Sequence, residues 1–263
     1  MKRRTLAILL TAAMTMGAAL TGCGDSAGDT SAESSSSDNT DTESSTEDSS
    51  SDTATEDLSG TITAAGSSAL KPLADDAADA FAELYPDVAI TIDAGGSGEG
   101  LKQVSEGTVD IGNSDVEASE KLDEAQAAEL VDHQVCVITM APIVNPDVKE
   151  GGVENLTKDQ LISIFTGETK NWSEVGGPDE DIVLVTRPTS SGTRATFQKY
   201  ALDGAEEASN ASMETDDSGV LLQNVKDTKG AIGYVALSYL VGETGVETVS
   251  IDGVEPTLEN TYN

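Results

Sequence analysis

Apolar residues along the chain alternate between the spacing of strands and the spacing of helices. Short runs such as GTITAAG and DVAITIDAG are rich in β-branched and small apolar residues and predict strands. Between them, the segment SALKPLADDAADAFAELYP repeats its apolar residues at helical spacing and stops at Pro86. That spacing predicts an amphipathic helix whose apolar face is made of Leu73, Ala77, Ala80, Phe81 and Leu84.

The same order of strand, turn and helix returns later in the sequence. We predict helices in GSGEGLKQVSEG, EKLDEAQAAEL, TKDQLISIFTG and SSGTRATFQKYAL. We predict strands in VDIGNSD, HQVCVITMAPIVNP, DIVLVTR and KGAIGYVALSYL, and the second of these would bury Cys136. Strands that alternate with helices predict an α/β fold with a mostly parallel sheet and helices on its faces.

The N-terminal segment has the features of a targeting signal. Three basic residues, Lys2 to Arg4, precede the apolar run TLAILLTAAMTMGAAL, which is too short to predict a spanning helix. The following LTGC resembles the bacterial lipobox, which implies that residues 1–22 are a lipoprotein signal peptide and that Cys23 carries a lipid anchor, palmitate included. The alternative is an ordinary cleaved signal followed by a chance cysteine.

Residues 23–58 have a composition that cannot support a packed core. The stretch from residue 24 onward holds eleven Ser and eleven Asp or Glu, with no basic residue and almost no large apolar one. Such a segment buries too little surface to offset its ordering entropy. We predict a disordered, self-repelling tether between the anchor and the folded body.

The charge balance restricts the class of partner. The chain has 48 acidic and 14 basic residues and a sequence pI near 4.1, which argues against nucleic acid and against anionic membrane surfaces. We attribute most of this charge to solubility, and we expect the acidic pairs Asp75–Asp76 and Asp216–Asp217 to be solvated. The chain offers no His/Cys cluster for a metal, and we expect no cofactor.

Three turns share one chemistry: AGSSAL, AGGSGEG and RPTSSGTR. Each follows a predicted strand, precedes a predicted helix and places hydroxyl side chains beside glycine, and the third also carries Arg187 and Arg194. Glycine allows close approach of a ligand, and a helix N-terminus offers unpaired N–H donors. In α/β sheets, ligand sites gather at the carboxyl ends of strands. The turns together predict a site for a small oxyanion, whereas any one of them alone is explained by a serine N-cap.

A hydrolase that uses Ser97 or Ser191 is the enzymatic alternative. GGSGE matches the nucleophile elbow only until Glu99 replaces its last glycine. A serine nucleophile needs a nearby base, and His133, the only histidine, lies outside all three turns. We therefore predict that the protein is not an enzyme.

Five segments, in order, resemble the substrate-binding protein of bacterial phosphate ABC transporters. They are GSSALKPL, GGSGEGLKQVSEGTVDIGNSD, IFTGETKNWSEVGG, RPTSSGTRATF and GAIGYVAL, and they cover most of residues 60–240. The resemblance implies a two-lobed periplasmic-binding-protein-like α/β fold of type II, with a hinge between the lobes and one phosphate in the cleft.

The resemblance also implies the ligand residues. Arg187 would pair with phosphate oxygens, and Asp115 would accept the proton of the bound ion. Hydroxyl and backbone donors would complete the site, from Ser68, Ala69, Ser97, Ser191, Gly192 and Thr193. The role of Arg194 stays open between ligand, helix cap and surface residue.

The chemistry of these residues suits protonated phosphate. A guanidinium presents a planar fork to two oxygens of a tetrahedral anion. Hydrogen phosphate donates a proton to a carboxylate, whereas sulfate at neutral pH has none and would leave a repelling, unpaired charge at Asp115. The alternative role for Asp115 is to cap a helix.

The resemblance further implies the domain plan and the partners. We assign the first lobe to residues 59–145, the second to 146–228, and a return to the first lobe to 229–263. Relatives usually continue beyond VEPTLENTYN, so we expect either a truncated or a short variant. We expect a monomer, lipid-anchored on the extracytoplasmic face of the cell membrane, that delivers phosphate to the permease and ATPase subunits of an importer. The alternatives are a protein for another oxyanion and a phosphate-sensing surface lipoprotein.

Overall fold

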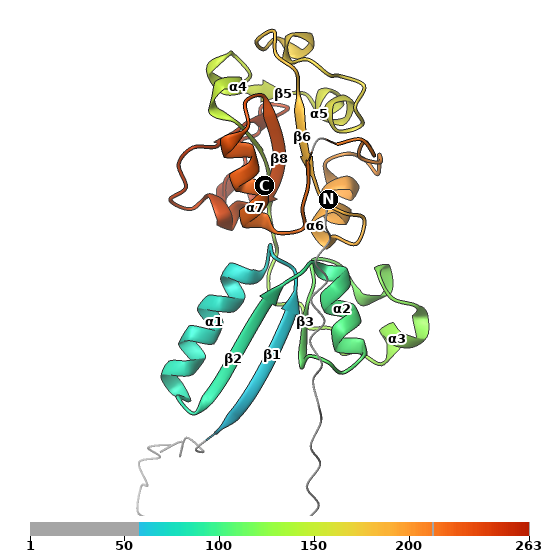
Figure 1. Cartoon of the computed structure of the whole chain (residues 1–263), viewed down its shortest axis with the longest axis vertical. Helices are drawn as coiled ribbons and strands as arrows, with labels where there is room; N and C mark the ends of the chain where they lie inside the picture. Colours follow the sequence, from blue (N-terminus) through green and yellow to red (C-terminus); the bar gives the residue numbers. More distant parts are fainter. Residues whose placement is uncertain (1–57, 212, 263) are drawn as a thin grey trace, which may run out of the picture. The chain divides into compact units, whose positions relative to one another are not determined.

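A computed structural model describes residues 58–211 and 213–262 (Figure 1). The predicted signal peptide, Cys23 and the predicted tether up to residue 57 lie outside the described residues. Within the part that is described, no helix has both the length and the apolar character needed to cross a membrane.

Strands and helices alternate along the chain. The strands are β1 (Gly60–Gly66), β2 (Val88–Ala94), β3 (Ile111–Asn113), β4 (Met140–Val144), β5 (Asn155–Leu156), β6 (Val183–Thr186), β7 (Met213–Glu214), β8 (Ala231–Ala236), β9 (Glu247–Thr248) and β10 (Ser250–Ile251). The α-helices are α1 (Lys71–Leu84), α2 (Ser97–Ser105), α3 (Glu124–Ala128), α4 (Pro146–Glu150), α5 (Lys158–Phe165), α6 (Gly192–Tyr200) and α7 (Ser218–Asp227). Short 3-10 helices are η1 (Ala118–Glu120), η2 (Trp172–Val175), η3 (Leu237–Leu240) and η4 (Glu259–Tyr262).

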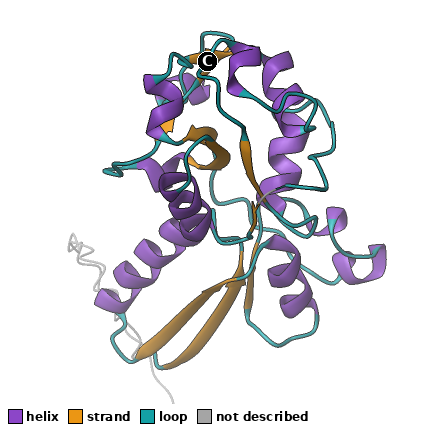
Figure 2. Cartoon of the chain, turned by 45° about the horizontal axis from the view of Figure 1, so that its top comes forward, coloured by secondary structure: helices purple, strands orange, loops and turns teal. Residues whose placement is uncertain are grey.

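The first lobe is built on a three-stranded parallel sheet in the order β2-β1-β3. Helix α1 packs along β2, and α2 packs along β1 and β3 (Figures 1 and 2). The registers pair Gly66 with both Ala94 and Asn113, so the three strands end at one level. Three loops therefore begin side by side at the carboxyl edge of this sheet.

The second lobe is built on a five-stranded mixed sheet in the order β7-β6-β8-β4-β9. Strand β6 is parallel to β7 and β8, whereas β4 is antiparallel to β8 and β9. All six residues of the central strand β8 are buried, and α7 packs against it. A separate two-stranded ladder joins β5 and β10.

Strand pairing corrects the predicted division into lobes. The sequence led us to place residues 59–145 in the first lobe and to return residues 229–263 to it. Instead, β4 already belongs to the second sheet, and β8 and β9 pair with it there. A fully apolar strand such as β8 can pair wherever both of its faces are covered, so its composition does not identify its sheet.

The core of the second lobe surrounds the aromatic residues. Trp172 is fully buried, and its indole N–H donates to the carbonyl of Gly230 at 2.9 Å. Phe197 stacks on Tyr234 at 3.9 Å between ring centroids, and Phe165 meets both rings edge-on. Such contacts add stabilisation beyond the buried area and hold α6 on the sheet.

Two apolar segments are more exposed than their composition suggests, and the prediction that Cys136 is buried is wrong. The predicted apolar face of α1 is largely unburied, because none of its residues is buried and Leu84 is 67% exposed. Cys136 is exposed rather than buried, and only the end of its apolar segment forms a strand, β4. Val135 and Val137 beside it are exposed as well, and no described strand pairs with them.

Candidate functional site

The first contribution to the site comes from the carboxyl edge of the first sheet. Gly66 has a φ of 137°, and a Cβ on it would lie 2.1 Å from the carbonyl oxygen of Asn113. Glycine is therefore required where the loops after β1 and β3 come together. This close approach places Ser67, whose N–H donates to the Asn113 carbonyl at 2.8 Å, next to the loop that carries Asp115.

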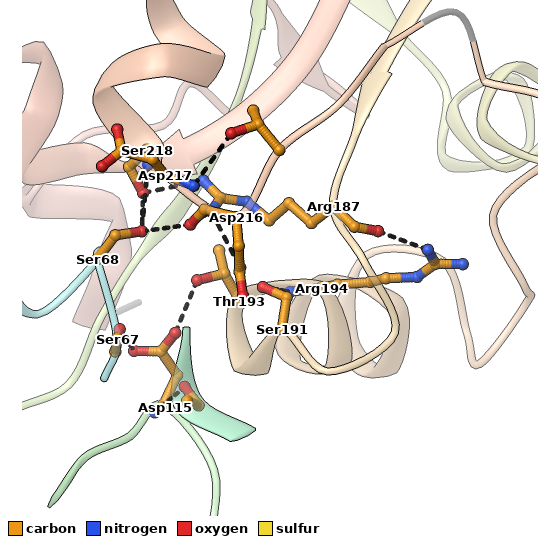
Figure 3. A network of polar contacts seen from close by, with 12 residues as sticks. Ser67, Ser68, Asp115, Arg187, Ser191, Thr193, Arg194, Asp216, Asp217 and Ser218 are labelled. Carbon is orange, nitrogen blue, oxygen red and sulfur yellow. Dashed lines mark hydrogen bonds and ion pairs between the residues drawn. The ribbon is translucent and has the colours of Figure 1, made fainter. Parts of the chain in front are cut away.

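Asp115 links hydroxyl groups from both lobes. One of its carboxylate oxygens accepts from Ser67 Oγ at 2.5 Å, and the other accepts from Thr193 Oγ1 at 2.7 Å (Figure 3). Its own N–H donates to Ser97 Oγ at 3.0 Å. Asp115 thus lies between the start of α2 and the start of α6, and its carboxylate does not cap its own helix.

The start of α6 fits closely against the first lobe. Ser191 is the N-cap of α6 and accepts from the Arg194 N–H at 3.3 Å. A Cβ on Gly192 would lie 2.1 Å from Ser97 Oγ, so only glycine fits there. Gly98 N–H also donates to the carbonyl of Ser190 at 3.2 Å. The N-terminal ends of α2 and α6, whose first N–H groups have no partner within their own helix, therefore meet at one place.

Arg187 is the buried cation of the site. It is 0% exposed, and its guanidinium lies 5.5 Å from the centroid of the Tyr234 ring. Nη1 donates to the Asp216 carbonyl at 3.1 Å, and Nη2 donates to Ser218 Oγ at 2.9 Å and to the Tyr234 carbonyl at 3.4 Å. Its Nε has no hydrogen-bond partner in the described structure.

Ser68, which belongs to the first lobe, contacts two of the residues that bond Arg187, namely Asp216 and Ser218. Its hydroxyl donates to the Asp216 carbonyl at 2.8 Å and lies 2.9 Å from Ser218 Oγ. Ala69 beside it is buried, at 4% exposed. Ser68 and Arg187, which are far apart in the sequence, therefore lie on either side of one backbone carbonyl (Figure 3).

A second layer of charge lies behind Arg187. Arg194 is 7% exposed, and its Nη1 donates to the Arg187 carbonyl at 2.6 Å, away from Ser68 and Asp115 in Figure 3. Its Nε lies 3.7 Å from Glu207, which accepts from the Tyr234 hydroxyl at 2.7 Å. Burial raises the pKa of Glu207 to about 7, against the lowering effect of the Tyr234 hydrogen bond and the two arginines. Arg194 is thus buried and bonded to the backbone of Arg187, so it is not a surface residue in this structure.

The structure brings together all the described residues that the sequence singled out for the site. They are Ser68, Ala69, Ser97, Asp115, Arg187, Ser191, Gly192 and Thr193. His133 is exposed, and no contact with the site is found for it in the described structure. The described residues also contain no cluster of His, Cys, Asp or Glu able to hold a metal ion.

Sequence reasoning missed three residues of the network: Ser67, Asp216 and Ser218. The expectation that Asp216 is solvated is wrong, because its side chain is only 16% exposed and lies 3.8 Å from Arg187 Nη1. Burial raises the pKa of Asp216, while hydrogen bonding to Ser191 and the charge of Arg187 act in the opposite direction. The signal was present in the sequence, since TDDSGV is a fourth hydroxyl- and glycine-bearing turn before a helix.

This network has the composition of an oxyanion site. Hydroxyls, helix N-termini and one arginine lie close together here, and most of these residues are buried. In such surroundings, fixed dipoles and a guanidinium stabilise an anion more strongly than they do in water. Asp115, which lies among these hydroxyl donors, favours an anion that carries a proton.

Comparisons with known proteins agree with this geometry. The family model described as a PBP superfamily domain matches residues 39–260. The phosphate-binding protein PstS of Bacillus subtilis (strain 168) is 55% identical over 202 residues, covering 77% of this chain and 65% of that protein. The chain therefore spans just under two thirds of the length of that relative.

Solved structures show the same fold. A structure described as a phosphate ABC transporter substrate-binding protein with bound phosphate, from Clostridium perfringens, matches with a TM-score of 0.68 and 34% identity over 78% of this chain and 81% of that one. An ABC-type phosphate transport receptor from Vibrio cholerae matches with a TM-score of 0.54 and 25% identity, over 76% and 80% of the two chains. The predicted two-lobed, periplasmic-binding-protein-like α/β fold is confirmed. The chain belongs to the PBP superfamily, and its resemblance to the substrate-binding proteins of phosphate ABC transporters is confirmed.

Proposed function

We propose that this chain binds inorganic phosphate outside the cell membrane and delivers it to an ABC-type phosphate importer. The observation that carries the proposal is that hydroxyls of both lobes gather around two groups: Ser67 and Thr193 bond Asp115, while Ser68 and Ser218 lie at the buried Arg187. It is supported by the Bacillus subtilis relative, which is a phosphate-binding protein, and by the Clostridium perfringens structure, which holds phosphate.

In the proposed complex, donors surround the anion. Arg187 pairs with two phosphate oxygens through its guanidinium fork. Backbone N–H groups at the starts of α2 and α6 donate to the remaining oxygens, because a helix N-terminus favours an anion. The other contacts come from Ser68, Ala69, Ser97, Ser191, Gly192 and Thr193.

Asp115 provides the selectivity for phosphate. It already accepts two hydroxyl hydrogen bonds, and a proton from hydrogen phosphate would be a further donor to it. Sulfate at neutral pH offers no proton, so its oxygens would face a carboxylate of the same sign. A binding protein for sulfate or another unprotonated oxyanion is disfavoured for this reason.

The proposed location follows from the N-terminal sequence and from the relatives. A signal peptide over residues 1–22 and a lipid on Cys23 would hold the protein on the outer side of the cell membrane, at the end of the tether. Its partners would be the permease and ATPase subunits of the importer, of which the monomer meets the permease from that side. A phosphate-sensing surface lipoprotein with the same site is the second candidate, favoured only by the anchor.

The proposal includes that the protein is not an enzyme. The relatives named above are binding or transport proteins. In this chain Ser97 accepts the Asp115 N–H, and Ser191 caps α6, so both serines have structural partners. The only histidine, His133, is exposed in the segment before β4 and offers neither serine a base.

Titration calorimetry of the phosphate-free protein tests the proposal. We expect tight binding of phosphate, and a loss of about 100-fold or more in the Arg187→Ala variant, because the anion would lose its buried charge partner. The matched control is Lys199→Ala, which removes an exposed cation from α6 and should leave the affinity within about twofold. Circular dichroism of both variants checks that each is folded. Phosphate affinity that is unchanged by Arg187→Ala would contradict the proposed site.

A further inference from the structure

Asp216 takes up the donors that the proposed site offers to phosphate. Its backbone carbonyl accepts from Ser68 Oγ at 2.8 Å and from Arg187 Nη1 at 3.1 Å. Its carboxylate lies 3.8 Å from the same guanidinium and is hydrogen-bonded to the hydroxyl of Ser191. Three of the predicted phosphate contacts therefore meet one residue of the protein itself (Figure 3).

The carboxylate of Asp216 also lies against the first lobe. A Cβ on Gly96 would be 1.7 Å from Asp216 Oδ2, so this oxygen occupies the space directly over the Gly96 backbone. Gly96 is the N-cap of α2 and precedes Ser97, another predicted ligand residue. The carboxylate thus lies between the starts of α2 and α6, where the anion would be bound.

The donors at this position suit an anion, but the Asp216 carboxylate does not use all of them. Asp216 Oδ2 is buried and has no hydrogen-bond partner in the described structure. The charged groups that act on the carboxylate are Arg187, Lys121 and Asp115, and the last is of the same sign. A buried oxygen without a donor is costly, so the carboxylate is held less well than an anion that uses all the donors.

Phosphate and the Asp216 carboxylate cannot use these donors together. Both carry negative charge, both would accept from Arg187 and Ser191, and the Asp216 carboxylate already occupies the space over Gly96. Two anions at contact distance in a buried site repel strongly. Binding of phosphate therefore requires the carboxylate to leave.

We propose that Asp216 is an internal competitor that occupies the anion position of the ligand-free protein and is displaced when phosphate binds. The inference rests on the proposed function, because it concerns the affinity of the same site. Asp217, the next residue, caps α7 through the N–H of Val220 and so fixes the chain just after Asp216. Displacement then needs rotation of the Asp216 side chain and a small shift of its carbonyl, with α7 in place.

As a consequence, the protein binds phosphate more weakly than it would if Asp216 did not occupy the same donors. When the binding-competent state of a protein is populated for only a fraction of the time, the apparent affinity for the ligand is reduced by that fraction. If the carboxylate occupies the site for about nine-tenths of the time, the apparent affinity for phosphate is reduced about tenfold. Because the competitor leaves before phosphate enters, this reduction falls on the association rate.

The test compares Asp216→Asn and Asp216→Ala with the full-length wild-type protein. Equilibrium dialysis with radiolabelled phosphate gives the Kd, and dilution into unlabelled phosphate gives the dissociation rate. The control is Glu214→Gln, which removes the same charge from an exposed residue two positions earlier. We expect both Asp216 variants to bind about tenfold more tightly with a dissociation rate within about twofold of the wild type, and Glu214→Gln to bind as the wild type does.

Three results would overturn the inference. An unchanged Kd in both Asp216 variants would mean that the carboxylate does not compete. Weaker binding with faster dissociation would make Asp216 a second proton acceptor for the bound ion. Absence of phosphate binding in the wild type and in every variant would remove the proposed function and this inference with it, whereas the first two results leave the proposed function intact.

Discussion

Replacing Glu207 by glutamine removes one buried titratable group from the layer behind Arg187. Glu207 is 4% exposed and accepts from the Tyr234 hydroxyl at 2.7 Å, a bond that a glutamine carbonyl can also accept. The variant therefore keeps the shape and the hydrogen bond and loses the charge. Its effect on stability should depend on pH, since the wild-type residue changes protonation near pH 7 and glutamine does not.

The sign and size follow from the pKa of Glu207. Burial raises this pKa in the folded protein to about 7, from an ordinary value of 4.5. Between these two values the folded chain keeps a proton that the unfolded chain has released, so stability falls as the pH rises. The contribution of Glu207 to the free energy of unfolding is fully present below about pH 4.5. About 3 kcal/mol of this contribution is lost by the time the pH has passed about 7.

Urea unfolding at several values between pH 5 and pH 8 measures this loss. The only tryptophan, Trp172, is fully buried and reports unfolding by fluorescence. We expect the free energy of unfolding of Glu207→Gln, relative to the wild type, to rise with pH by about 2 to 3 kcal/mol across this range. The control is Glu206→Gln, whose side chain is 83% exposed in the wild type. A difference between Glu207→Gln and the wild type that stays flat with pH would refute the reasoning.

Two further predictions concern the contact between the lobes and the choice of anion. Gly192→Ala should weaken phosphate binding about tenfold, because its Cβ would meet Ser97 Oγ at 2.1 Å and force the starts of the two helices apart; calorimetry checks this, and an affinity equal to the wild type would contradict the close fit. Asp115→Asn should weaken phosphate binding and allow detectable sulfate binding, since the repelling carboxylate is gone. Titration with both anions measures the ratio of affinities, and the same ratio in variant and wild type would show that Asp115 does not select.

Local sequence predicted most of the elements, because their signals lie within a few residues. The segment TKDQLISIFTG predicts a helix, and α5 forms there with Thr157 and Gln160 in a capping box. The turns that carry Ser68, Ser97 and Ser191 also follow strands and precede helices as expected. Each of these features depends on capping, periodicity and glycine, which the chain encodes at short range.

Local sequence patterns did not predict which elements pack against one another. Strand β8 reads as a buried strand, but nothing in its six apolar residues distinguishes a place beside β4 and β6 from a place in the first sheet. Cys136 lies in an equally apolar run and is exposed, because no described element covers that run. An apolar composition favours burial of a segment, but the element that would cover it comes from elsewhere in the chain.

The sequence by itself determined the strand–turn–helix units, the acidic surface and the hydroxyl- and glycine-rich turns that suit an oxyanion. Only the tertiary structure decided that the carboxylate of Asp115 joins Ser67 to Thr193 and that Asp216 lies over Gly96 between the two lobes. The physical reason is range. Capping and periodicity act over a few residues, whereas the surroundings of Asp216 include Gly96, more than a hundred positions away in the sequence, which only folding brings close to it.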